Sequence, residues 1–197
     1  MNRQQIERYF NALSSEYSNQ CIIILTGAAA GALYGNVRAT MDIDFAVTTE
    51  DWELFTKAIA KVSDRMAIEA QYAEDIDRWS AITLMDYKEH TYLHKRFGSI
   101  EIRLMEPPYW AIGKLSRYLD SDIGDLVKVF MKTNTSWQDV ASVAGNALRK
   151  SPKSTSCILF VRQTEDFFKR YGHKTWGKKF PIDEAIKAFR DSAGIIK

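Results

Sequence analysis

The sequence has few of the residues that mark secreted and membrane proteins. Only two of the 197 residues are cysteine, Cys21 and Cys157, and they lack the spacing of a metal ligand set. Because disulfide frameworks belong to oxidising compartments, two isolated cysteines favour a reducing, cytoplasmic setting. The first residues lack the long apolar core of a secretory signal, and no apolar run approaches the length that spans a membrane. We therefore expect a cytoplasmic protein with no membrane partner.

The net charge is only +2, but the charges are distributed unevenly along the chain. Residues 145–197 carry twelve Lys and Arg against five Asp and Glu, whereas residues 1–144 carry fifteen against twenty. A basic C-terminal third beside an acidic front part suits an anionic partner such as RNA or a nucleotide. A solvated lysine-rich surface is the other interpretation of such a charge run.

In residues 1–106, apolar residues recur at the spacings of both strands and helices. In residues 107–197 they recur at helical spacing only. These patterns predict strands at 21–25, 42–47, 67–72, 79–85 and 99–105. They predict helices at 4–14, 28–34 and after Thr48, and then at 109–119, 123–132, 137–150, 157–171 and 183–191. Capping boxes are expected at Thr48 and Ser136, and a helix end at Gly172. The predicted fold class is α+β, with a mixed sheet flanked by helices in residues 1–106 and a C-terminal helical bundle in 107–197.

Residues 26–47 combine a glycine turn with two carboxylates. Gly27 follows an apolar strand, and Asp42 and Asp44 flank Ile43 at the start of the next one. Because side chains alternate along a strand, the two aspartates share one face and Ile43 occupies the other. Two neighbouring carboxylates suit a hard divalent cation such as Mg²⁺, completed by substrate phosphates. A glycine between a strand and a helix lets backbone N–H groups approach a phosphate.

This pattern resembles the signature of the DNA polymerase beta-like nucleotidyltransferase superfamily. Residues 25–28 match the glycine turn, residues 42–45 match the acidic pair, and Glu101 on a later strand matches the third carboxylate. The segment Arg38-Ala39-Thr40 before the pair is similar to the AbiEii-type branch, which includes toxins of toxin–antitoxin systems. Lys114, followed by Asp122 and Asp125, is similar to the helix pair in which a lysine and a downstream aspartate complete the site.

The resemblance implies a nucleotidyltransferase-like fold and a magnesium-dependent transfer of a nucleoside monophosphate from an NTP to a hydroxyl acceptor. It implies that a two-metal Mg²⁺ site is held by Asp42, Asp44 and Glu101. It assigns catalytic roles to Asp42, Asp44, Glu101, Lys114 and Asp125, and nucleotide binding to Thr26, Gly27, Ala28 and Arg38. An RNA such as tRNA is a candidate acceptor, steered by basic residues near Trp176 and Phe180, and an antitoxin protein is a candidate partner.

Other interpretations of the same residues remain open. The acidic pair is also compatible with a solvated strand face, and Lys114 with a surface lysine. Glu101 is also compatible with pairing to Arg103 or to a neighbouring strand. Ala28 stands where many relatives have Ser or Gly, which keeps open a non-catalytic nucleotide-binding or regulatory module of the same fold. An aminoglycoside-type nucleotidyltransferase is a third alternative. It would need an acidic acceptor pocket, which the basic C-terminal third does not favour.

Overall fold

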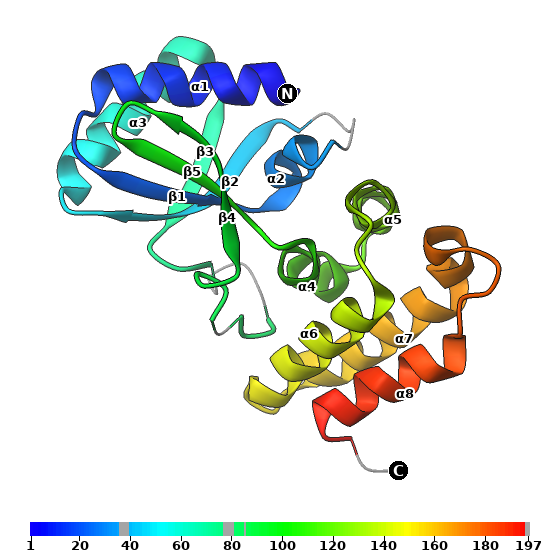
Figure 1. Ribbon diagram of the computed structural model, residues 1–197. Coiled ribbons are helices and arrows are strands. Elements are labelled where there is room, and N and C mark those ends of the chain that lie inside the picture. Colours follow the sequence, from blue (N-terminus) through cyan, green and yellow to red (C-terminus); the bar gives the residue numbers. More distant parts are fainter. Residues whose placement is uncertain (36–39, 77–80, 85, 196–197) are drawn as a thin grey trace. The chain divides into compact units, whose positions relative to one another are not determined.

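The computed structural model describes residues 1–35, 40–76, 81–84 and 86–195 and divides into two compact units (Figure 1). The first unit comprises Met1–Ile76 and Lys88–Met105, and the second comprises Asp77–Tyr87 and Glu106–Lys197. The sequence assigns all of residues 1–106 to the first domain, whereas 77–87 group with the second unit. Two contacts hold this segment there: Lys150 Nζ lies 2.6 Å from Asp86 Oδ2, and the Thr83 N–H donates to Ser151 Oγ at 2.9 Å.

The first unit contains a mixed five-stranded sheet in the order β3-β2-β1-β5-β4. Its strands are β1 (Cys21–Leu25), β2 (Asp42–Thr49), β3 (Glu69–Ala73), β4 (Thr91–Phe97) and β5 (Ile100–Met105). The central strand β1 pairs antiparallel with β2 and parallel with β5. At the edges, β3 runs parallel to β2 and β4 runs antiparallel to β5. The predicted combination of a mixed sheet with flanking helices is confirmed.

One face of this sheet forms the core of the first unit with two helices. The helices of the unit are α1 (Arg3–Glu16), α2 (Gly27–Leu33) and α3 (Trp52–Met66). Phe45 of β2 is fully buried, and its ring lies 6.1 Å from that of Phe10 in α1 and 6.4 Å from that of Phe55 in α3. Burial of such aromatic and aliphatic side chains, each worth about 1.5–3 kcal/mol, fixes which face of β2 points inward.

In the second unit the described residues form helices and no strand. The helices are α4 (Pro107–Arg117), α5 (Asp120–Thr133), α6 (Trp137–Lys150), α7 (Thr155–Trp176) and α8 (Ile182–Ala193). An aromatic cluster in this unit comprises Phe130, Phe167, Phe168, Trp176 and Phe180. Helices α6 and α8 approach so closely that a Cβ on Gly145 would lie 2.5 Å from Ser192 Cβ. No helix in the described ranges is both long and apolar enough to cross a bilayer.

Three local predictions are corrected by the structure. Helix α3 is capped by Asp51, which accepts from the Leu54 N–H at 2.8 Å, because Thr48 still belongs to β2. Helix α7 continues through Gly172 to Trp176, and Gly177 ends it. Gly172 serves close packing instead, since a Cβ there would lie 2.1 Å from the Phe180 ring. Of the strand predicted at 79–85, residues 81–84 form no strand and the others lie outside the described residues.

Candidate functional site

The acidic pair lies at the start of β2. Asp42 and Asp44 alternate with Ile43 and Phe45, which are fully buried, whereas both aspartates are half-exposed. The alternation that the sequence predicts is therefore present, with both carboxylates on one face of the sheet. Because the apolar side chains anchor the strand from the other face, a shift of register that would turn the aspartates inward is strongly disfavoured.

The glycine turn and the acidic pair are in direct contact. The Thr26 N–H donates to the Asp44 carbonyl oxygen at 2.9 Å, which brings the end of β1 beside the start of β2. Gly27 has φ +60°, and a Cβ on it would lie 2.2 Å from Asp44 Oδ2. A side chain at position 27 would therefore be strained and would collide with the carboxylate. Thr26, Gly27 and Ala28 are all half-exposed, and the Thr26 side chain makes no capping hydrogen bond to α2.

The Asp42 carboxylate is held by a neighbouring hydroxyl group. Thr40 Oγ1 lies 2.8 Å from Asp42 Oδ1 and 3.1 Å from the Asp42 carbonyl oxygen. Thr40 is 5% exposed, although it belongs to the connection between α2 and β2. In the sequence it is part of the AbiEii-like segment, but no role followed from its position. A hydroxyl residue two positions before an acidic pair is the signal that could have indicated this contact.

The sheet register does not bring Glu101 to the acidic pair. Glu101 lies level with Ile22 of β1, which in turn lies level with Thr48 of β2, four residues beyond Asp44. At about 3.3 Å per residue and roughly 4.8 Å per strand, Glu101 is displaced by about 13 Å along the sheet and about 10 Å across it. Among the described residues no group of three His, Cys, Asp or Glu side chains could hold a metal ion. The predicted third carboxylate is therefore not part of this pair.

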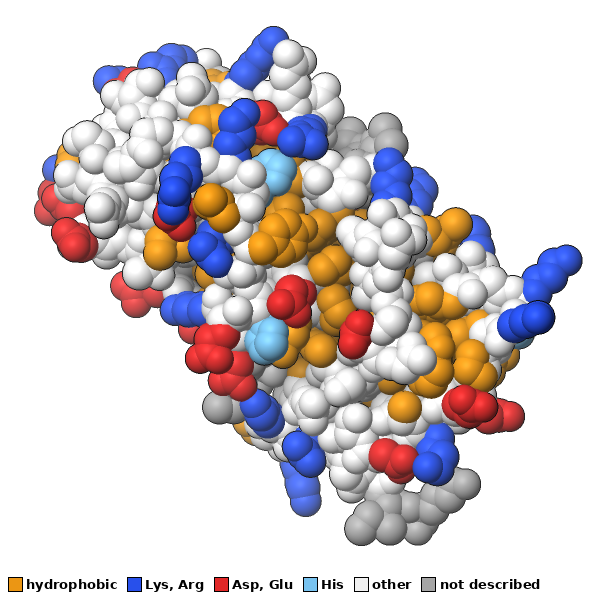
Figure 2. Space-filling view, viewed as in Figure 1, with side chains coloured by type: hydrophobic (Ala, Val, Ile, Leu, Met, Phe, Trp, Pro, Cys, Tyr) orange, Lys and Arg blue, Asp and Glu red, His pale blue; other side chains and the backbone are white. Residues whose placement is uncertain are grey.

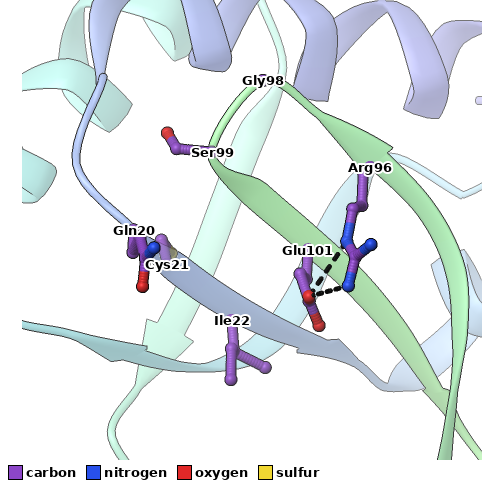
Figure 3. Close-up of a pocket in the computed structure, with 7 residues that line it drawn as sticks. All are labelled: Gln20, Cys21, Ile22, Arg96, Gly98, Ser99 and Glu101. Carbon is purple, nitrogen blue, oxygen red and sulfur yellow. Dashed lines mark hydrogen bonds and ion pairs between the residues drawn. The ribbon is translucent and has the colours of Figure 1, made fainter.

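Glu101 instead forms ion pairs with two arginines. Arg96 Nε donates to Glu101 Oε1 at 3.0 Å (Figure 3). Arg103 Nη1 lies 3.5 Å from Glu101 Oε2. The hydrogen bond from Arg96, followed by the one from Arg103, lowers the pKa of the Glu101 carboxyl. Together with residues 20–22, Glu101 and Arg96 line a surface cavity of about 360 Å³. Both alternatives for Glu101 are thus observed, since it pairs with Arg103 on its own strand and with Arg96 on the neighbouring strand β4.

Lys114 belongs to a buried ionic cluster of the second unit. It is 2% exposed, and its Nζ donates to Asp122 Oδ1 at 2.9 Å and to Asp125 Oδ2 at 2.8 Å. Arg117 Nη2 also donates to Asp122 Oδ1, at 2.7 Å, and the two cations outweigh burial so that the pKa of Asp122 is lowered. The structure thus joins the predicted lysine and aspartates, but a phosphate would have to displace two carboxylates to reach Lys114. This geometry supports a structural role for Lys114 in holding α4 to α5. The interpretation of Lys114 as a surface lysine is wrong.

The basic segment at the end of α7, defined here as Lys169, Arg170, Lys174, Lys178 and Lys179, is exposed throughout. No Asp or Glu occurs between residues 167 and 182. Figure 2 shows Lys and Arg side chains standing out from the surface in this part of the second unit. Trp176 stacks on Phe180 at 4.9 Å and on Phe130 at 5.8 Å, and its Nε1 donates to the Thr135 carbonyl oxygen. These aromatic rings therefore serve the helical core and are not free to stack on bases.

The acidic pair fits a divalent cation with two protein carboxylates. Both groups are hard oxygen donors, one held by Thr40 and the other resting in a space beside Gly27 that a Cβ would fill. Mg²⁺ commonly takes only one or two carboxylates and completes its shell with water and substrate phosphates, so a third protein ligand is not required. Arg38, the predicted phosphate contact, lies outside the described residues.

Comparisons of the chain with protein-family models, with curated proteins and with solved structures find no match. The candidate site is therefore defined by its own geometry and by the motif resemblance in the sequence.

Proposed function

We propose that this chain is a magnesium-dependent nucleotidyltransferase that moves a nucleoside monophosphate from an NTP to a hydroxyl acceptor. The observation that carries the proposal is the contact between the Gly27 turn and Asp44, beside a second carboxylate on the same strand face. Phosphoryl-transfer sites need both elements, because phosphates must approach a backbone closely while their charge is balanced by a cation.

The residues have separate tasks in this proposal. Asp42 and Asp44 provide the oxygen ligands of the cation. The missing side chain of Gly27 leaves room for the Asp44 carboxylate beside the turn, and backbone N–H groups of the Thr26–Ala28 turn would approach the triphosphate. Bound Mg²⁺ would supply charge neutralisation at the phosphates and at the leaving pyrophosphate. The acceptor oxygen forms a bond to the α-phosphorus, pyrophosphate leaves, and the hydroxyl proton passes to a carboxylate of the pair. Glu101 takes no part, because it is held by Arg96 and Arg103 away from the pair.

The activity is tested by incubating the protein with each labelled NTP, Mg²⁺ and either total tRNA or protein. Label transfer by the wild type, lost in Asp42→Ala and Asp42→Asn, is the expected result. Asp64→Asn provides a matched control, because Asp64 is an exposed carboxylate on α3. It should keep the activity of the wild type. Transfer that persists in both Asp42 variants would refute the proposed site.

The basic segment favours an RNA as the hydroxyl acceptor. Because its aromatic neighbours are packed in the core, the segment would contact RNA through phosphates and not through base stacking. The affinity should therefore depend steeply on salt and little on sequence. Lys178→Glu should weaken RNA binding and reduce the salt slope by about one, whereas Lys187→Glu on α8 should have a smaller effect. Equal effects of the two variants would show that net charge alone determines binding.

A role as the toxin of a toxin–antitoxin pair rests only on the AbiEii-like motif.

A non-catalytic nucleotide-binding module is the second candidate. It is favoured by the engagement of Glu101 with two arginines, which leaves two carboxylates where the superfamily signature has three. This candidate predicts that NTPs and Mg²⁺ raise the thermal stability of the protein, that Asp42→Asn abolishes this shift, and that label is transferred to no acceptor. The labelled-NTP experiment therefore distinguishes the two functions.

A further inference from the structure

Thr40 combines deep burial with a hydrogen bond to a candidate metal ligand. Thr40 is among the few buried polar residues in the part of the chain that the structure describes, at 5% exposure, whereas its neighbour Met41 is 87% exposed. The hydroxyl oxygen lies within hydrogen-bond distance of two oxygens of Asp42, at 2.8 Å to Oδ1 and 3.1 Å to the carbonyl. A hydroxyl group carries one hydrogen, and the bond to an ionised carboxylate is the stronger and shorter of the two.

We propose that Thr40 is a positioning residue for Asp42, whose buried hydroxyl fixes the Asp42 carboxylate for cation binding. The inference rests on the proposed metal site and adds a residue to it. Because threonine is branched at Cβ and buried here, its hydroxyl has little rotational freedom. The hydrogen bond to Oδ1 therefore fixes the rotation of the carboxylate and leaves Oδ2 for a ligand.

The two carboxylates of the pair are thus held in different ways. The Asp44 carbonyl accepts from the Thr26 N–H, and Asp44 Oδ2 lies beside Gly27. Asp42 is positioned by the Thr40 hydroxyl group. Groups that hydrogen-bond to metal-ligating side chains fix ligand orientation, and removing them typically costs about 10–100-fold in metal affinity. We expect an effect at the lower end of this range, because the hydroxyl contacts only one of the two ligands.

The experiment measures the affinity of the whole protein for Mn²⁺, by the decrease of the free-ion electron paramagnetic resonance signal. Thr40→Val removes the hydroxyl and keeps the shape of the side chain, and Thr40→Ser keeps the hydroxyl. We expect about a tenfold loss of Mn²⁺ affinity in Thr40→Val and less than a threefold loss in Thr40→Ser. Asp42→Asn should abolish binding at the site. Circular dichroism of each variant without metal reports whether the fold is intact, and Thr40→Ala replaces Thr40→Val if the latter does not fold.

The outcomes separate this inference from the proposed function. Absence of Mn²⁺ binding by the wild type would overturn the proposed metal site itself. Binding by the wild type and Thr40→Val with equal affinity, lost in Asp42→Asn, would leave the site intact and overturn the role of Thr40. If Thr40 only stabilises the chain, Thr40→Val lowers the melting temperature while its folded fraction binds Mn²⁺ like the wild type, which also overturns the inference.

Discussion

Substituting Gly27 by alanine should be more damaging than substituting Gly98 or Gly113, because two costs coincide at position 27. An alanine at φ +60° is strained by about 1–2 kcal/mol. In addition, its Cβ would lie 2.2 Å from Asp44 Oδ2, so either the Asp44 side chain or the turn has to move. Displacing a carboxylate and the strand start that carries it adds a cost typical of overpacking, about 1–3 kcal/mol. We expect Gly27→Ala to lower the free energy of unfolding by about 2–5 kcal/mol.

Two other glycines provide matched controls for the two costs. Gly98 has φ +55°, but the nearest atom to its Cβ would be Ser14 Cβ at 3.6 Å, an ordinary contact. Gly98→Ala should therefore lower the free energy of unfolding only by the cost of backbone strain at positive φ. Gly113 lies inside α4 with no atom within 4 Å of its Cβ, so Gly113→Ala should be neutral or stabilise by up to about 1 kcal/mol.

The assay is urea unfolding followed by circular dichroism, with a double-mutant cycle between positions 27 and 44. In an Asp44→Ala background the two closest atoms are removed and only the Cβ at position 44 remains, 3.3 Å away, so Gly27→Ala should cost little more than Gly98→Ala. An interaction energy of at least about 1 kcal/mol is expected between the two positions. If Gly27→Ala and Gly98→Ala cost the same in the wild-type background, the argument for a close contact between Gly27 and Asp44 is wrong.

Three further predictions concern the rest of the molecule. Lys114→Met should destabilise the protein by about 3–5 kcal/mol in urea unfolding, because it leaves two buried carboxylates without their shared cation. Hydrogen bonds donated by Lys95, with the larger effect, and by Arg3 lower the pKa of the Glu7 carboxyl to about 2. Because the folded-state pKa is lower than the unfolded value of 4.5, ionised Glu7 stabilises the folded protein above pH 4.5, and this contribution should be lost as the pH falls from 4.5 to 2. In a plot of the free energy of unfolding against pH, Glu7→Gln should therefore flatten this range. Burial raises the pKa of the Cys21 thiol to about 12, so in native protein a thiol reagent should modify Cys157 first and Cys21 only on unfolding.

Local regularities of the sequence determined the parts of the fold that depend on near neighbours. The alternation at 42–47 is enough to put Asp42 and Asp44 on the face opposite Phe45, because side-chain direction in a strand follows from backbone geometry. Helical spacing likewise indicated the five helices behind residue 106. In addition, the position of Gly27 between a strand and a helix indicated a turn that needs glycine. These features require no knowledge of what lies across the sheet or across the bundle.

Strand register and burial were decided by the tertiary structure. Whether Glu101 reaches the acidic pair depends on how β5 aligns with β1 and how β1 aligns with β2, and no local pattern fixes that alignment. The burial of Lys114 between α4 and α5 likewise depends on the facing of two helices. The hydrogen bond from Thr40 to Asp42 joins residues two positions apart, but the burial of Thr40 depends on tertiary packing. The sequence therefore specified which residues carry the chemistry of the acidic pair, whereas packing over long separations decided which other residues join them.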